Sequence, residues 1–143
     1  MSQTPSTYAP PRPRRQHERQ ALRLSLAFVA AVNEHDKSAM KALLAEDLDY
    51  VRPGGGRLSR AGDVIRQYER DWASLASTVE VLRIAQAFDQ VFAEVAIHAT
   101  VDGKPATIPG VVIHRWQGGR LINYRLYPDP LAQSVAATQP ARD

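Results

Sequence analysis

The sequence has 143 residues, 44% of them hydrophobic and 23% charged, which fits a single soluble globular domain and leaves low complexity only at the two ends. Cysteine is absent, so disulfides, thiolate catalysis and cysteine-bound zinc are excluded, and a reducing cytoplasm is the simplest location. Four arginines and one glutamate in residues 1–20 account for the net charge of +3, so the folded part is neutral and we do not expect it to bind nucleic acid.

Residues 1–18 form a basic tail that contains four of the ten prolines, and we expect this tail to be disordered. A basic arm that contacts phosphate is the alternative interpretation. Twin arginines followed by an apolar segment also fit an export signal, but Glu18 interrupts the basic part, and Arg23 and Ser25 interrupt the apolar part. No uninterrupted apolar run approaches the roughly 18 residues of a membrane span, so we expect no membrane insertion.

Helical spacing of apolar residues runs from about Arg19 to Asn33 and predicts a mostly buried first helix. Its apolar stripe consists of Leu22, Leu26, Val29 and Ala30, widened by Leu24, Phe28 and Ala31. The polar residues 33–36 break this pattern, and either Asp36 or Ser38 can accept the free amides at the start of a second helix. The apolar residues of that helix are Met40, Leu43 and Leu44. A short helical hairpin is therefore expected.

A strand-like pair, Tyr50-Val51, then leads through Arg52 into a Pro-Gly turn, after which Ser59 is expected to cap a third helix. One face of that helix carries Val64, Ile65, Tyr68 and Trp72, and the other carries Arg66, Glu69 and Arg70.

From Thr78 onward the period changes to that of strands rich in valine and isoleucine. We expect four strands, in the segments VEVLRIAQAF, VFAEVAIHATV, ATIPGVVIHRW and RLINYRLY. The pairs Asp102-Gly103 and Gly118-Gly119 are typical of hairpin turns. Helices followed by an antiparallel meander predict an α+β domain with helices on one face of a curved sheet.

Two segments resemble a known family. FVAAVNEHDKSAMKALLAEDLDYVRP is similar to the helix-helix-strand opening of ketosteroid isomerases and SnoaL-type polyketide cyclases, in the nuclear transport factor two-like superfamily, and WQGGRLINYRLYPDP resembles its last hairpin. The resemblance covers roughly residues 20 to 135 and implies a domain at 19–135, with 136–143 as a disordered tail. It implies a cone-shaped barrel, made of a strongly curved, mainly antiparallel sheet covered by three N-terminal helices, which encloses a deep apolar pocket and is often found in a homodimer.

The resemblance also shows what this sequence lacks. The phenol, the general base and the buried acid of ketosteroid isomerases fall on Phe28, Arg52 and Pro109, none of which can do that chemistry. The catalytic positions of limonene-type epoxide hydrolases fall on Leu126, Val95 and Ile97. Leucine at 126 also stands where cyclases use an acid. Asp129 remains, either as a cap of the strand end or at the rim of the pocket.

Two alternatives for Arg52 stay open, because it is two residues from Tyr50 on one strand face but also beside a turn. Pointing inward, it would be the strongest polar group of the pocket and would need an anion, either a ligand or one of the carboxylates Asp47, Asp49 and Asp71. Pointing outward, it would lie in water with its stem on Tyr50.

The direction of the His114 side chain depends on the register of the last hairpin. A two-residue turn at Gly118-Gly119 would set Ile113 opposite Tyr124, whereas a three-residue turn would bring His114 to the Tyr124 side, where it is the best remaining general acid or base. In the last strand we expect Ile122, Tyr124 and Leu126 to line the pocket. Its other walls are expected from Phe28, Tyr68, Trp72, Val95 and Ile97.

Glu94 and His98 share the opposite strand face, a weak metal-binding pattern, and we expect neither a metal nor a cofactor. Two functions then remain. The first is a cyclase, isomerase or dehydratase acting on a small hydrophobic metabolite, either neutral or anionic, in which Arg52 and either Tyr50 or Tyr124 polarise an oxyanion and His114 moves a proton. The alternative is a non-catalytic module that binds a ligand or partner and dimerises through its sheet.

Overall fold

The computed structural model describes the backbone of residues 12–129 and the side chains of residues 20–129. Three helices come first, α1 (Arg12–Asn33), α2 (Lys37–Leu43) and, after two strands, α3 (Ala61–Leu75). The strands are β1 (Leu44–Val51), β2 (Arg57–Arg60), β3 (Thr78–Ala87), β4 (Gln90–Val101), β5 (Lys104–Gln117) and β6 (Arg120–Pro128). The expectations for residues 1–11 and 130–143 lie outside this part of the chain.

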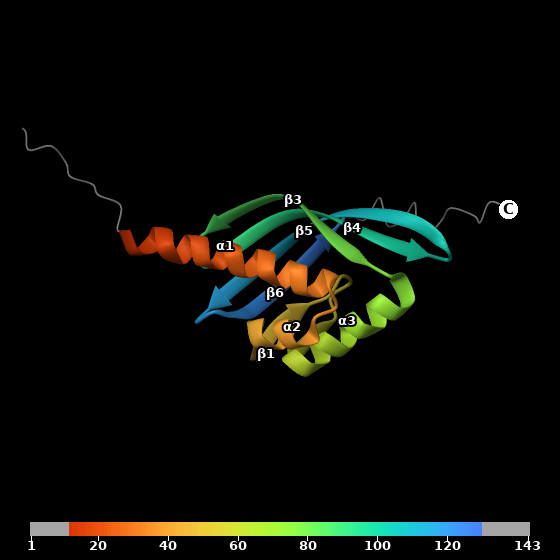
Figure 1. Cartoon of the computed structure of the whole chain (residues 1–143), viewed down its shortest axis with the longest axis horizontal. Coiled ribbons are helices and arrows are strands. Elements are labelled where there is room, and N and C mark those ends of the chain that lie inside the picture. Colours follow the sequence, from red (N-terminus) through yellow and green to blue (C-terminus); the bar gives the residue numbers. More distant parts are fainter. Residues whose placement is uncertain (1–11, 130–143) are drawn as a thin grey trace, which may run out of the picture.

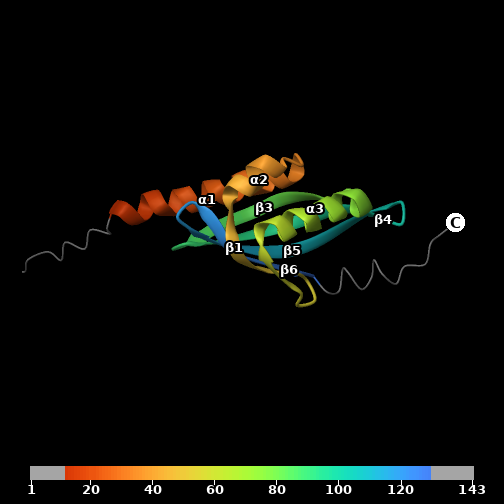
Figure 2. The ribbon, with the colours of Figure 1, turned by 90° about the horizontal axis from the view of Figure 1, so that it is seen from below.

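The six strands form one curved sheet in the order β2-β1-β6-β5-β4-β3 (Figure 1). All neighbouring pairs are antiparallel except β1 and β6, which run parallel. The expected α+β class and the four-stranded meander are thus confirmed. The helices lie on one face of the sheet, and no described helix covers the other face (Figure 2). The sheet ends at β2 and β3 and is not closed into a barrel. None of the described helices is long and apolar enough to cross a bilayer.

Helix α1 differs from expectation in its start and in its buried face. It begins at Arg12, not near Arg19. The expected stripe was wrong by about one position, because Leu26 is 42% exposed and Ala30 is also exposed. The residues that α1 buries are Ala21, Ser25, Phe28, Ala31 and Val32. Ser25 had been read as an interruption of the apolar segment, yet its spacing of three and four residues from Phe28 and Ala21 is the helical period itself.

The start of α2 follows the first of the two predicted caps, because the carboxylate of Asp36 accepts a hydrogen bond from the amide of Ala39 at 3.0 Å. We expect Asp36→Ala to lower the free energy of unfolding by about 1 kcal/mol, the usual effect of losing such a cap. Ser38→Ala, at an exposed position, should change it by less than about 0.5 kcal/mol. Urea unfolding of both variants checks this, and equal losses would contradict the assignment.

Helix α3 begins without the cap that was predicted. Ser59 lies inside the short strand β2, and the residue at the cap position is Arg60, whose side chain makes no capping hydrogen bond. The prediction was wrong by one residue, because β2 pairs with β1 as far as Arg60, so that α3 begins at Ala61 and Arg60 takes the cap position.

A bulge in β6 sets the register of the last hairpin. Gln117 pairs with Arg120 and Trp116 with Leu121, as a two-residue turn requires. The next pair, Arg115 with Asn123, leaves Ile122 without a partner on β5. One extra residue exchanges the two faces of a strand. Leu121 therefore becomes fully buried in place of Ile122, and His114 comes to lie opposite Tyr124.

Candidate functional site

Three neighbouring strands place aromatic residues side by side on the helix-covered face. Tyr50 of β1 pairs with Tyr124 of β6, which pairs with His114 of β5. All three side chains are buried. The rings of Tyr50 and Tyr124 stack at a centroid distance of 4.2 Å, and those of Tyr124 and His114 lie 5.3 Å apart. The bulge in β6 is what brings His114 into this row.

The helices complete the group from above. Phe28 of α1 presents its ring edge-on to Tyr68 at 6.2 Å and to His114 at 5.7 Å. Tyr68 and Trp72, one turn apart on α3, have ring centroids 6.1 Å apart. We call the six residues Phe28, Tyr50, Tyr68, Trp72, His114 and Tyr124 the aromatic cluster. Tyr68 and Trp72 are partly exposed and the other four are buried, so the cluster opens toward solvent on its α3 side.

The tyrosines of the cluster are kept protonated by their surroundings. The hydroxyl of Tyr50 donates to that of Tyr68 at 2.9 Å. Burial, above all, raises the pKa of Tyr50, Tyr68 and Tyr124 above the ordinary value of a phenol, because a phenolate would lose its hydration there. At neutral pH all three therefore remain hydrogen-bond donors.

His114 is held by a buried serine. Its Nδ1 lies 3.0 Å from the hydroxyl oxygen of Ser25, which also accepts a 2.7 Å hydrogen bond from the indole nitrogen of Trp116. Burial lowers the pKa of His114 to about 3, so the imidazole is neutral at pH 7. It cannot be the near-neutral acid or base that its ordinary pKa suggested, and it acts as an uncharged hydrogen-bonding group.

The tautomer of His114 determines what its free nitrogen offers. If the serine hydroxyl donates to Nδ1, the ring proton is on Nε2, which becomes a donor. If Nδ1–H donates to the serine, Nε2 presents a lone pair. In either case, Nε2 has no hydrogen-bond partner within residues 20–129.

A second buried nitrogen of the cluster is also unpaired. The indole Nε1 of Trp72, a donor only, has no partner among the described residues. Buried polar atoms are rarely left without a partner, and an unmade hydrogen bond at such an atom costs about 1 to 3 kcal/mol. Two such atoms in one aromatic cluster are therefore the strongest indication of a ligand site in this structure.

Arg52 does not belong to the site, and the inward alternative is wrong. Strand β1 ends at Val51, so Arg52 is the first residue of the turn and its side chain is exposed. Its backbone closes that turn, with its amide bonded to the carbonyl of Gly56 at 2.7 Å. The spacing of two residues from Tyr50 has no consequence for side-chain direction once the strand has ended.

The sheet residues that the family resemblance matched to catalytic positions are mostly apolar. Val95 of β4 is fully buried, and Ile97 of β4 and Leu126 of β6 are partly buried and pack against the hydrophobic core. Pro109 is exposed on β5, where the buried neighbour is Gly110, so the motif match at Pro109 fell on the wrong face. Asp129 is exposed, and its amide donates to the carbonyl of Pro109 at 2.8 Å.

Glu94 and His98, the residues of the weak metal-binding pattern, each contact other side chains. His98 contacts Glu80 of β3, at 2.8 Å from Nε2 to the carboxylate, and Thr107 of β5, at 3.2 Å from Nδ1 to the hydroxyl, while Glu94 lies 3.7 Å from Arg83. No group of three metal-ligating side chains occurs within residues 20–129.

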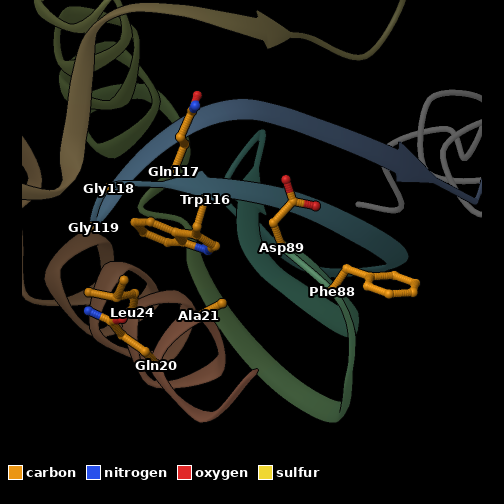
Figure 3. Close-up of a pocket in the computed structure, with 9 residues that line it drawn as sticks. All are labelled: Gln20, Ala21, Leu24, Phe88, Asp89, Trp116, Gln117, Gly118 and Gly119. Atoms are coloured by element: carbon orange, nitrogen blue, oxygen red, sulfur yellow. The ribbon is translucent and has the colours of Figure 1, made fainter. Parts of the chain in front are cut away.

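A shallow pocket of about 200 Å³ lies beside the cluster, against Trp116 (Figure 3). The indole of Trp116 faces Ala21 and Leu24 of α1. The ring of Phe88, which is 70% exposed, points away from that indole. The pocket contains none of the expected site residues. We place the candidate site in the aromatic cluster because the unpaired nitrogens are there.

The sequence analysis named all six residues of the aromatic cluster but not the residues that hydrogen-bond to His114 and its serine partner. Ser25 and Trp116 were missed as partners of His114, although a serine at helical spacing among buried residues was a usable signal. No local signal indicated Trp116, since its partner lies on another element.

A family model described as a SnoaL-like domain matches residues 26–124. No curated protein matches the sequence. Among solved structures, a candidate SnoaL-like polyketide cyclase from Jannaschia sp. CCS1 has a TM-score of 0.77 at 14% identity, covering 98% of this chain and 99% of that one. A candidate polyketide cyclase from Xanthomonas campestris pv. campestris has a TM-score of 0.75 at 23% identity, with coverages of 84% and 97%.

An LEH-like epoxide hydrolase of M. tuberculosis is also similar, with a TM-score of 0.73, 21% identity and coverages of 80% of this chain and 86% of that one. At these identities the structural likeness establishes the fold and not the reaction.

Proposed function

Because the chain belongs to the SnoaL-like domain family, whose fold supports small-molecule binding, we propose that it binds a small hydrophobic metabolite at the aromatic cluster and acts on it as a cofactor-independent cyclase, isomerase or dehydratase. The observation that carries this proposal is the pair of buried, unpaired nitrogens, Trp72 Nε1 and His114 Nε2, beside three protonated phenols. A ligand oxygen would accept a hydrogen bond from Trp72 Nε1, and it would accept a second one from His114 Nε2 in the tautomer that carries the proton there.

The chemistry available to such a site is the stabilisation of negative charge on oxygen. Phenol and indole donors fixed in an apolar cluster stabilise an enolate or phenolate oxygen more than they would in water, and they need no rearrangement as charge develops. Leu126 on β6 and Gly110, the buried neighbour of Pro109 on β5, carry no acid, so the oxygen would be polarised by neutral donors.

A homodimer and a cytoplasmic location belong to the same proposal. The uncovered face of the sheet exposes large apolar side chains, among them Val111 and Tyr127, which pair on β5 and β6 and are 40% and 53% exposed. A second copy of the chain would remove this surface from water. A non-catalytic module that uses the same face and the same cluster for binding is the alternative function.

Binding of 2-naphthol, a fluorescent apolar phenol, tests the site directly. We expect saturable binding to the wild-type protein. Tyr68→Phe, which removes one hydroxyl at the open side of the cluster, should raise the Kd about tenfold, the effect of one hydrogen bond in an apolar site. Arg52→Ala is the matched control and should leave the Kd unchanged, since that side chain is exposed.

Failure of the wild type to bind 2-naphthol, or an equal loss in Arg52→Ala and Tyr68→Phe, would contradict the location of the site. Binding without turnover of any cyclisable or enolisable compound would favour the non-catalytic alternative.

A further inference from the structure

A carboxylate lies on the buried side of α3. At about 100° per residue, Asp71 is only about 20° from Val64 and about 60° from Tyr68 around the helix. Val64 is fully buried, and Asp71 itself is partly buried. The exposed side chains Arg66 and Glu69 are about 140° and 160° away from Asp71 around the helix axis. Asp71 therefore interrupts the apolar face of α3 beside the open side of the aromatic cluster.

The partners of Asp71 do not neutralise it. One carboxylate oxygen accepts a 3.0 Å hydrogen bond from the side-chain amide of Gln67, one turn earlier. No ion pair to Asp71 is found within residues 20–129, although the same helix pairs Asp63 with Arg66 and Glu69 with Lys37. The Gln67 amide is a neutral donor and binds one of the two carboxylate oxygens of Asp71.

The carboxylate of Asp71 interacts electrostatically with two phenols of the cluster. Besides burial, which is the main cause, the carboxylate of Asp71 contributes to the raised pKa of both Tyr68 and Tyr124. Asp71 is thus the acid beside the cluster, whereas Asp49, next to Tyr50 on β1, points to the opposite face of the sheet and contacts Arg57 and Asn123.

On the premise that the proposed function is correct, we propose that Asp71 is the general base of the site and that the substrate is an apolar ketone or 1,3-dicarbonyl compound. The carboxylate of Asp71 takes a proton from the carbon next to the carbonyl group. The electrons of that C–H bond form the C=C bond of an enolate, whose oxygen accepts hydrogen bonds from the cluster. The enolate carbon then adds to the carbon of a second carbonyl group in the same substrate, whose C=O π electrons move to oxygen and take the proton back from Asp71. In an unsaturated ketone, the proton returns instead from Asp71 to the far carbon of the dienolate.

This assignment gives the site the base that its family positions lack. Arg52 is exposed and has no proton-accepting form, and His114 is a weak base because burial lowers its pKa to about 3. Asp71 approaches from a helix instead of from a strand, so it could not be found by matching strand motifs.

Deuterium uptake by 2-tetralone in D₂O, followed by NMR, tests the proposal on the full chain. The wild-type protein is expected to accelerate exchange of the protons next to the carbonyl. Asp71→Asn should reduce the protein-dependent rate about a hundredfold or more, the scale of general base catalysis, and change the Kd for 2-tetralone less than about threefold. Asp71→Glu should retain part of the rate. Glu69→Gln, which changes an exposed carboxylate two residues earlier on the opposite side of α3, is the matched control and should behave as wild type.

An exchange rate in Asp71→Asn equal to that of the wild type would overturn the assignment. So would the loss of both 2-tetralone binding and exchange in Asp71→Asn when its Tm is unchanged. If the wild type binds 2-tetralone without accelerating exchange, the base proposal fails and the binding site stands. If it does not bind, the proposed function itself fails. Should Asp71→Asn unfold, Asp71→Glu decides, since a rate equal to wild type or equal to the uncatalysed rate would each contradict a positioned base.

Discussion

Replacing Phe28 by alanine is expected to lower the free energy of unfolding by about 3 to 5 kcal/mol, the largest effect of any single change considered for this protein. The side chain is 1% exposed and touches both layers, with its ring edge-on to Tyr68 of α3 and to His114 of β5. Its removal leaves a cavity between rigid rings, which cannot collapse as flexible side chains can.

Urea unfolding of Phe28→Ala and of a control, Leu26→Ala, measures this effect. Leu26 lies two residues earlier on α1 but is 42% exposed, so we expect its truncation to cost less than about 1 kcal/mol. The sequence alone assigned Leu26 to the centre of the buried stripe. Similar losses at the two positions would show that the buried face of α1 is not the one described.

Acidification from about pH 7.5 to about pH 4.5 is expected to remove about 2 to 3 kcal/mol of stability through His114 alone. The folded-state pKa of this histidine is lowered to about 3, against an ordinary value of 6.5, because burial disfavours the charged ring. Above pH 6.5 neither state binds the proton. Between pH 6.5 and 3 the unfolded chain binds it and the folded protein does not, so stability falls as the pH falls through this window.

The comparison that isolates His114 is His114→Gln, whose amide can still bond to Ser25 but cannot titrate in this range. Its unfolding free energy should depend less steeply on pH than that of the wild type, by about 1 kcal/mol per pH unit below pH 6.5. His98→Gln, at a half-exposed histidine paired with Glu80, controls for the loss of a histidine as such. An unchanged slope in His114→Gln would contradict the burial of an uncharged imidazole.

The sequence could predict the elements and their order, because the underlying signals are local. The change from helical to strand period at Thr78 predicted the α+β class, and an aspartate before an apolar run predicted the start of α2 correctly. The aromatic cluster was also within reach, since Tyr50, Tyr68 and Tyr124 each lie on the apolar face of an expected element.

The direction of side chains at the ends of helices and strands could not be predicted from the sequence. Arg52 turns outward because β1 stops one residue before it, and Ser59 is not a cap because β2 forms there by pairing with β1. Both outcomes depend on which strand lies alongside, and that information is distributed over distant residues.

By itself, the sequence determined an α+β chain with helices before strands and an apolar interior. Only the tertiary structure decided the site. A single extra residue in β6 brings His114 to the row of Tyr50 and Tyr124, where Ser25 from α1 holds it. Helical and strand periods are local properties, whereas register and burial arise from packing of the whole chain. Burial is also what lowers the pKa of His114, so that its imidazole is uncharged, and what raises the pKa of the three tyrosines beside it.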